Sequence, residues 1–257
     1  MSLRYRTPGG LVVAATSGRY RNAAGASVPF GPPATQVTVV GTPTSGNTGG
    51  GTRNTPFDLA FPDGWAAGDF ALLFGHGSAT ALTLSAPFPD WTPHPAVSPL
   101  DQGSNSRLYL WSRVLQAGDT PPPLTPSGAI TAGWELIVLR GADRIRQVAN
   151  STAANAGSLA LPALTAALAG SVILANVHSR IGSGTPPTAL NLAAGWTKPV
   201  DHGTSRNTSS ANLRMALGHR DATAGTVYGG DTASTSPATL SSMIGLLVEV
   251  GSVSTTG

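Results

Sequence analysis

The sequence of 257 residues has no cysteine, a single lysine (Lys198) and only two glutamates, and charged residues make up 11% of it. Without cysteine there are no disulfides or thiolate metal ligands, so stability has to come from burial. No apolar run approaches the roughly 20 residues that a membrane helix needs. The segment Leu11–Ala15 is too short for the apolar part of a signal peptide. We expect a protein without a membrane segment that is made in a cell's cytoplasm and could leave by lysis, as a virus particle does.

Glycine and proline are abundant, with 32 and 21 residues, and they are spread between short apolar segments. This distribution is typical of many short strands joined by turns. Around position 110, Leu108 and Leu110 alternate with Tyr109 and Trp111, which is the period-two pattern of a strand. The composition therefore predicts an all-β protein with a sizeable core.

The chain also contains an internal repeat. Asn, Arg, Leu, Arg, Ala and Gly recur at an offset of 107 between residues 105–118 and 212–225. Ala67-Gly68 matches Ala169-Gly170, and Leu136 and Gly141 match Leu246 and Gly251 at nearby offsets. We interpret this as a duplication, with repeat 1 at about 62–141 and repeat 2 at about 164–251.

Each repeat is expected to hold four strands, at about 68–76, 80–85, 106–116 and 132–141, and at about 170–179, 187–192, 211–220 and 241–250. Four strands alone bury too little surface to fold independently. We therefore predict one antiparallel two-sheet β-sandwich of jelly-roll type over residues 57–257, with two tandem sandwiches as the alternative. The alignment of the repeats places Leu108 and Leu110 inward, with Met215 and Leu217 as their counterparts.

Residues 1–35 look different from the body, since they contain no acidic residue. They have too little apolar content to fold alone, so we predict a basic extended arm or small hairpin that docks on an acidic partner. Residues 36–56 are expected to form a strand and a flexible loop. The predicted docking residues are Arg4, Tyr5, Arg6, Arg19, Tyr20 and Arg21.

The sequence carries little recognisable chemistry. His178, His202 and His219 are loosely grouped with Asp201 and Asp221, where a metal or acid–base site is conceivable. However, no metal-ligand spacing, nucleophile elbow or phosphate-binding loop is present. We therefore predict no enzyme activity, no catalytic residues, no metal and no cofactor.

Three further pairs of residues invite a functional interpretation. His76 and His178 occupy matching strand ends, which favours a structural role, and Glu135 and Glu249 are expected to be strand-end charges that face solvent. Trp91 and Trp196 match between the repeats, and a repeated Trp after a turn is more often a core plug than a sugar platform. Nucleic-acid binding through the basic arm is not expected, because the body lacks a basic groove.

The strand signature resembles a family of phage minor tail proteins from viruses of high-GC bacteria. Its members show a Gly-Asp strand start, a Gly-Trp-Thr turn, an Arg-Leu-x-Leu strand followed by Ala-Gly, and a strand that ends in Arg-Gly. The chain matches these in residues 57–251, with Asp90 in place of the glycine before Trp91. The matching segments are Gly68-Asp69-Phe70, Trp91-Thr92, Arg107-Leu108-Tyr109-Leu110, Ala117-Gly118-Asp119, Leu139-Arg140-Gly141 and Gly195-Trp196-Thr197.

The resemblance implies a virion structural protein, a minor tail protein that is attached through its arm and contacts the host surface. A capsid decoration protein is one alternative, and a carbohydrate-binding module or lectin is another. The expected partners are other virion proteins of the tail or capsid, copies of the chain in a homo-oligomer or symmetric assembly, and a host-surface glycan. The expected location is the virion.

Overall fold

The computed structural model describes only part of the chain, and all of its regular structure there is β-strand. Backbone alone is described for residues 3–6, 12–15, 18–21 and 27–30. Side chains are described within residues 36–48, 55–78, 84, 90–104, 106–128, 130–182, 187–203, 212–238 and 241–252. No helix that could span a membrane occurs in these segments. The prediction of an all-β protein is confirmed.

The first of two central sheets is built around β7 (Phe70–Gly77), which pairs antiparallel with β11 (Ser106–Val114) on one side and β13 (Ala132–Arg140) on the other. Shorter strands complete it at both edges. These are β9 (Thr92–Pro93) and β10 (Leu100–Gln102) beside β11, and β5 (Thr38–Val39) and β6 (Thr44–Asn47) beside β13.

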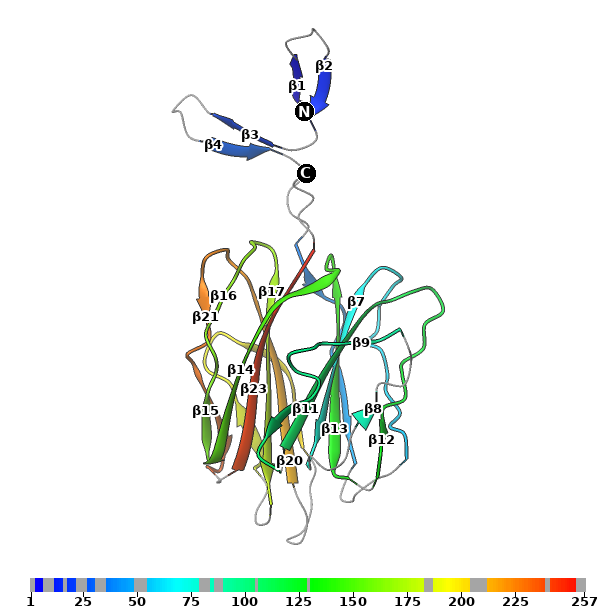
Figure 1. Ribbon diagram of the computed structural model, residues 1–257, viewed down its shortest axis with the longest axis vertical. Helices are drawn as coiled ribbons and strands as arrows, with labels where there is room; N and C mark the ends of the chain where they lie inside the picture. Colours follow the sequence, from blue (N-terminus) through cyan, green and yellow to red (C-terminus); the bar gives the residue numbers. More distant parts are fainter. Residues whose placement is uncertain are drawn as a thin grey trace.

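The second central sheet comes from the later part of the chain. It has the strand order β14-β23-β17-β20-β19, and all of its pairs are antiparallel. The strands are β14 (Arg144–Ala156), β17 (Val172–Ile181), β19 (Thr197–Gly203), β20 (Asn212–Asp221) and β23 (Ser241–Gly251). The two central sheets lie face to face (Figure 1).

A thinner layer covers the outer face of each central sheet, so that the body has four layers (Figure 1). Over the first sheet lie β8 (Leu84–Ser85) and β12 (Thr125–Pro126). The cover of the second sheet consists of β15 (Ser158–Ala160), β16 (Leu164–Thr165), β18 (Ala189–Asn191), β21 (Val227–Tyr228) and β22 (Thr232–Ser236).

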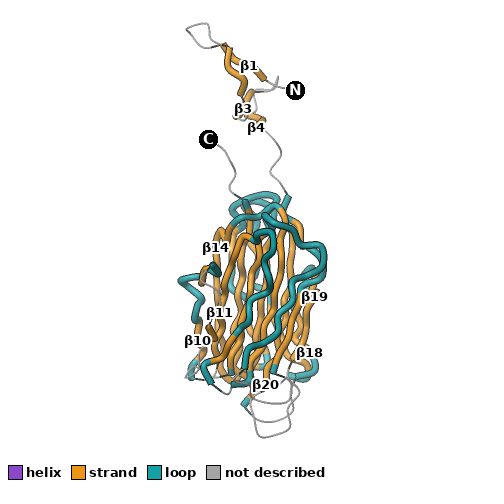
Figure 2. The backbone as a smooth tube through the Cα atoms, turned by 90° about the vertical axis from the view of Figure 1, so that its right-hand side faces the viewer, coloured by secondary structure: helices purple, strands orange, loops and turns teal. Residues whose placement is uncertain are grey.

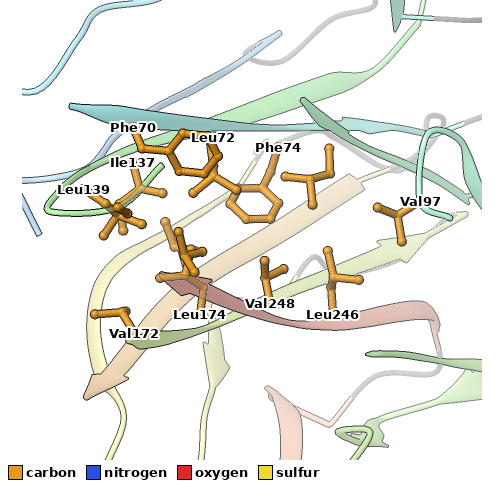
Figure 3. Close-up of a cluster of buried hydrophobic side chains, with 14 of the residues drawn as sticks. Phe70, Leu72, Phe74, Val97, Ile137, Leu139, Val172, Leu174, Leu246 and Val248 are labelled. Carbon is orange, nitrogen blue, oxygen red and sulfur yellow. The ribbon is translucent and has the colours of Figure 1, made fainter. Parts of the chain in front are cut away.

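The central strands are apolar on both faces because both faces are buried. In β7, Phe70, Leu72 and Phe74 point into the layer between the sheets, whereas Ala71 and Leu73 point into the outer layer. Figure 3 shows Phe70, Leu72, Phe74, Ile137 and Leu139 of the first sheet facing Val172, Leu174, Leu246 and Val248 of the second. One apolar layer therefore joins the two halves of the chain.

The six long strands expected from the repeat all form, within a few residues of the expected bounds. Leu108, Leu110 and Leu217 are fully buried in the layer between the sheets, and Met215 is fully buried beside Gly133 of the opposite sheet. The prediction that these side chains face inward is confirmed. Residues 79–83, which hold most of the strand expected at 80–85, lie outside the described part of the chain.

The two-sheet sandwich is confirmed, whereas its jelly-roll type is not. Each central sheet takes its strands from one half of the chain, and β11-β7-β13 and β20-β17-β23 have the same order. That order agrees with the repeat, but it does not by itself establish a duplication. Strand β14, the longest of the described strands, was not predicted, because more than half of its residues are polar.

The arm contains two pairs of strands. β1 (Leu3–Arg6) pairs with β2 (Val12–Ala15), and β3 (Gly18–Arg21) pairs with β4 (Ser27–Phe30). Figures 1 and 2 show both pairs beyond one end of the body, which we call the arm end. We call the opposite end, where β6 and β19 finish, the far end.

The chain enters the body at the arm end and is bonded there to both sheets. The amide of Val37 donates to Gly170 O at 2.8 Å in the second half of the chain, and the amide of Val40 donates to Val138 O at 2.9 Å in the first sheet. Strand β23 reaches the same end, where Asp143 N donates to Gly251 O at 3.2 Å.

We predict that Leu110→Ala lowers the free energy of unfolding by about 2–5 kcal/mol, because it leaves a cavity between the sheets. Val227→Ala is the matched control, since Val227 is 60% exposed and its truncation should change stability by no more than about 0.5 kcal/mol. Urea unfolding measures both. Equal effects of the two substitutions would mean that Leu110 is not a core residue.

Candidate functional site

At the far end, the layer between the sheets holds polar side chains in place of apolar ones. They continue the inward-facing rows of their strands, as His76 follows Phe70, Leu72 and Phe74 in β7. We call His76, Ser106, Glu135, Asn176, His178 and His202 the polar cluster. The first five of these residues are fully buried, whereas His202 keeps 17% of its side chain exposed.

Glu135 is the centre of the polar cluster. Its Oε2 lies 3.2 Å from His76 Nε2 and accepts a hydrogen bond from the side-chain amide of Asn176. Its Oε1 lies 3.9 Å from His202 Nε2. Glu135 and His76 belong to the first sheet and the other two to the second, so these contacts cross between the sheets.

The two matching histidines also meet across the layer. The ring centroids of His76 and His178 lie 4.8 Å apart, and His178 Nδ1 lies 3.2 Å from Ser106 Oγ. At the edge of the layer, Asn47 Nδ2 donates to Gly203 O at 3.1 Å and lies 3.4 Å from His202 Nδ1. Asn47 thus joins β6 of the first sheet to β19 of the second.

Several buried atoms of the polar cluster have no hydrogen-bond partner among the described residues. These atoms are His76 Nδ1, Glu135 Oε1, Asn176 Oδ1, His178 Nε2 and His202 Nε2. A buried polar group without a partner costs about 1–3 kcal/mol, and native proteins contain few of them. Five in one place mark this end of the layer as less stable than the apolar remainder.

Burial keeps the cluster uncharged. Desolvation lowers the pKa of His76 to about 3, lowers that of His178 well below its usual value, and also lowers that of His202. Desolvation raises the pKa of Glu135 to about 7, against the opposing effects of His202 and Asn176. Burial thus disfavours charge on all three histidines, and Glu135 carries its proton in weakly acidic solution.

The cluster contains groups that catalyse reactions in other settings. Ser106 and His178 lie within hydrogen-bond distance, as a nucleophile and its base would, but both are fully buried and no substrate could reach them. Among the described residues, no three histidine, aspartate or glutamate side chains are arranged to hold a metal ion.

The sequence-based view of the two glutamates was wrong, because neither faces solvent. Both Glu135 and Glu249 are fully buried. Burial raises the pKa of Glu249, but bonds from the amides of Ala167 and Leu168 and from Gln147 and Ser171 outweigh it and lower the pKa overall. Glu249 is thus a well-bonded carboxylate, and Glu135 is not.

The loose group expected in the second repeat is divided. His178 and His202 enter the polar cluster with His76, which the sequence did not connect to His202. Asp201 instead pairs with Lys198 at 2.7 Å and Arg214 at 2.6 Å. His219 pairs in register with Leu174, nearer the arm end.

Both repeated tryptophans are buried, which confirms that they are core plugs. Trp91 is 3% exposed and Trp196 is 9% exposed, and the guanidinium of Arg220 lies 4.3 Å from the centre of a Trp196 ring. Neither indole offers a free face to a sugar, so the idea of a sugar platform made of these two residues is wrong.

The remaining candidate places are a surface groove and the arm. A groove of about 510 Å³ lies between β9 and the start of β14, but its Arg113 already pairs with Asp90 at 3.0 Å and Asp119 at 2.6 Å. The six predicted docking residues of the arm lie in β1 and β3, and their side chains are outside the described part of the structure.

No protein-family model, curated protein or solved structure matches this chain. What the protein does has to be inferred from its body, its arm and its polar cluster.

We predict that Glu135→Gln stabilises the protein in alkaline but not in weakly acidic solution. The pKa of Glu135 is higher in the folded than in the unfolded protein, so its protonated form stabilises the fold. This contribution is complete below about pH 4.5 and is lost as the pH rises through about 7. Glutamine cannot ionise, so only the wild type should lose stability between pH 5 and pH 8.5. The free energy of unfolding of the variant minus that of the wild type should rise by up to about 3 kcal/mol between these pH values. Urea unfolding at the two pH values measures this gain.

Glu249→Gln is the control for that experiment. Its carboxylate has a lowered pKa and bonds to backbone amides, so it stays ionised at both pH values. The substitution should destabilise the protein by a similar amount at pH 5 and pH 8.5. If Glu135→Gln behaved like this control, Glu135 would be ionised in the folded protein at pH 5.

Proposed function

We propose that the protein is a virion structural protein, a phage minor tail protein that its N-terminal arm attaches to the particle. The observation that carries this proposal is the pairing of the arm strands. In the described part of the chain, β1, β2, β3 and β4 pair only within the arm and lie beyond the end of the body (Figure 2). Together with the family resemblance, this supports a body that serves as a module and an arm that serves as its connector.

The composition of the arm supports docking on an acidic surface. Residues 1–35 contain four arginines and two tyrosines but no acidic residue. Arginine makes planar, two-pronged contacts with carboxylates, and tyrosine adds rigid apolar area. A two-stranded pair is marginally stable in water and keeps open strand edges. A partner that supplies carboxylates or a further strand would complete the arm.

The architecture of the body supports a structural role. The central strands of both sheets are buried on both faces, and in the described part of the body the serine and histidine that lie within hydrogen-bond distance are fully buried. With the arm at one end, the far end points away from the attachment point. We propose that the far end is the part that contacts the host surface, and that the equal strand order of the two sheets reflects a duplication.

A position on the capsid would use the same arm in the same way, and copy number separates the two positions. A decoration protein covers the shell in hundreds of copies, whereas a tail protein follows the lower symmetry of the tail. Quantitative mass spectrometry of purified particles gives this number. Absence of the protein from the particles would contradict both positions.

We predict that deletion of residues 2–33 leaves the body folded but abolishes incorporation into particles. The body should keep its thermal unfolding transition, because none of its described strands pairs with the arm. The test compares particles assembled with full-length and truncated protein, by mass spectrometry. A truncated protein that assembles at the normal copy number would contradict the docking role of the arm.

A variant with Ala at Arg4, Arg6, Arg19 and Arg21 tests the charge of the arm separately. It should bind particles that lack the protein more weakly than the wild type does at low salt. The difference should shrink as the salt concentration rises, because salt screens the wild-type contacts. Ala substitution of Arg144, an exposed arginine of the body, is the matched control and should leave binding unchanged. Equal binding by the fourfold variant and the wild type at low salt would mean that the charge of these arginines does not contribute to docking.

A further inference from the structure

The polar cluster interrupts the contact between the sheets at one end only. From the arm end to the middle, the facing side chains are apolar, as Leu72 and Leu174 are. At the far end they are ionisable or polar, and five of their buried atoms have no partner among the described residues. The two ends of one continuous layer therefore respond differently to protonation.

We propose that the polar cluster is an acid-operated latch, in which protonation of its histidines opens the far end of the layer between the sheets while the arm end stays closed. The latch is a property of the body and does not depend on the proposed place of the protein in a virion. Its members come from both sheets, so a charge placed on them acts directly on the contact between the sheets.

The geometry leaves no room for charge in the closed state. An imidazolium at His76 would lie 4.8 Å from the ring of His178 and would be fully buried with it. Glu135 contacts His76 and lies 3.9 Å from His202, but a single carboxyl group can balance at most one of three imidazolium charges. Buried charges without a counter-ion are among the most costly arrangements in proteins.

The charged groups around the cluster do not relieve this cost. Arg180 of β17 and Arg214 of β20 are positive, and both act against protonation of a cluster histidine. Asp201 of β19 is negative and raises the pKa of His202, but it already binds Lys198 and Arg214, and burial lowers the pKa of His202 overall. Opening to water is the remaining way for the histidines to take up protons.

The point of entry is the edge where β6 meets β19. His202 is the one member of the cluster with an exposed fraction, and at this edge its Nδ1 lies 3.4 Å from Asn47 Nδ2 of the opposite sheet. Asn47 Nδ2 faces His202 Nδ1, so protonation of this nitrogen turns an acceptor into a donor and sets it against the amide hydrogens of Asn47. Water that enters there reaches His76 and then His178.

Proton counting gives the expected steepness. When the far end opens between about pH 4.5 and 5.5, three histidines each take up about one proton, and Glu135 releases about one because its pKa returns to its ordinary value. The net uptake of about two protons makes the opening constant rise about 100-fold per pH unit.

Hydrogen exchange of the full chain, read by mass spectrometry and corrected for intrinsic rates, tests the latch. As the pH falls from 7 to 4.5, peptides from β6, β19 and the far ends of β7 and β17 should lose protection, and they should do so with this slope between about pH 5.5 and 4.5. Peptides from the arm end, such as the start of β7, should keep theirs. A loss of protection that rises equally at both ends would be ordinary acid unfolding and would overturn the proposal.

Two variants change the proton count in opposite directions. His202→Gln removes one proton that is taken up, so the slope should fall to about 10-fold per pH unit, whereas Glu135→Gln removes the released proton and should raise it to about 1,000-fold. His94→Gln, which changes a histidine in the surface groove outside the cluster, should leave the slope at the wild-type value. Unchanged slopes in both cluster variants would overturn the proposal.

A titration of the wild-type protein covers the case in which a variant does not fold. Imidazole NMR signals of His76 and His178 should keep their neutral positions until the far end opens and should then change together. Independent titration of either ring near the ordinary pKa of histidine, with the far end still protected from exchange, would also overturn the latch.

Discussion

The body depends on one constraint, which is that both central sheets are buried on both faces. Apolar runs such as the one in β7 supply two rows of side chains, one for the layer between the sheets and one for the outer layer. Since neither face can meet water, each sheet needs a cover, and the short strands after Ser158 and around Thr125 provide it. The shared layer then makes the two halves of the chain one unit.

The same constraint explains why the polar cluster matters. A histidine on an exposed sheet would titrate without consequence, but His76 and His178 lie in a row that is otherwise apolar. Their burial suppresses charge, and Glu135 remains protonated for the same reason. Glu249 shows the other solution, since backbone amides and a hydroxyl hold its carboxylate in the charged form.

Most of the fold could be predicted from the sequence, because the long central strands have a pattern that burial on both faces imposes. Strand β14 could not, since its polar residues reflect an edge position, and strand pairing is not visible in composition. The site was largely missed for a similar reason. Glu135 and His202 are 67 positions apart in sequence, on strands of different sheets, and only the packing of those sheets brings them together. The matching of His76 with His178 and the loose grouping of His178 with His202 were the signals that pointed to the cluster.

The way the chain enters the body has a mechanical consequence. Val37 is bonded to the second half of the chain and Val40 to the first sheet, so the segment from the arm is fastened to both sheets within four residues. A tensile load applied through the arm would be divided between the two sheets at once, instead of peeling one from the other. A body held in this way can bear a force applied through its arm without loading the far end, where the contact between the sheets is weakest.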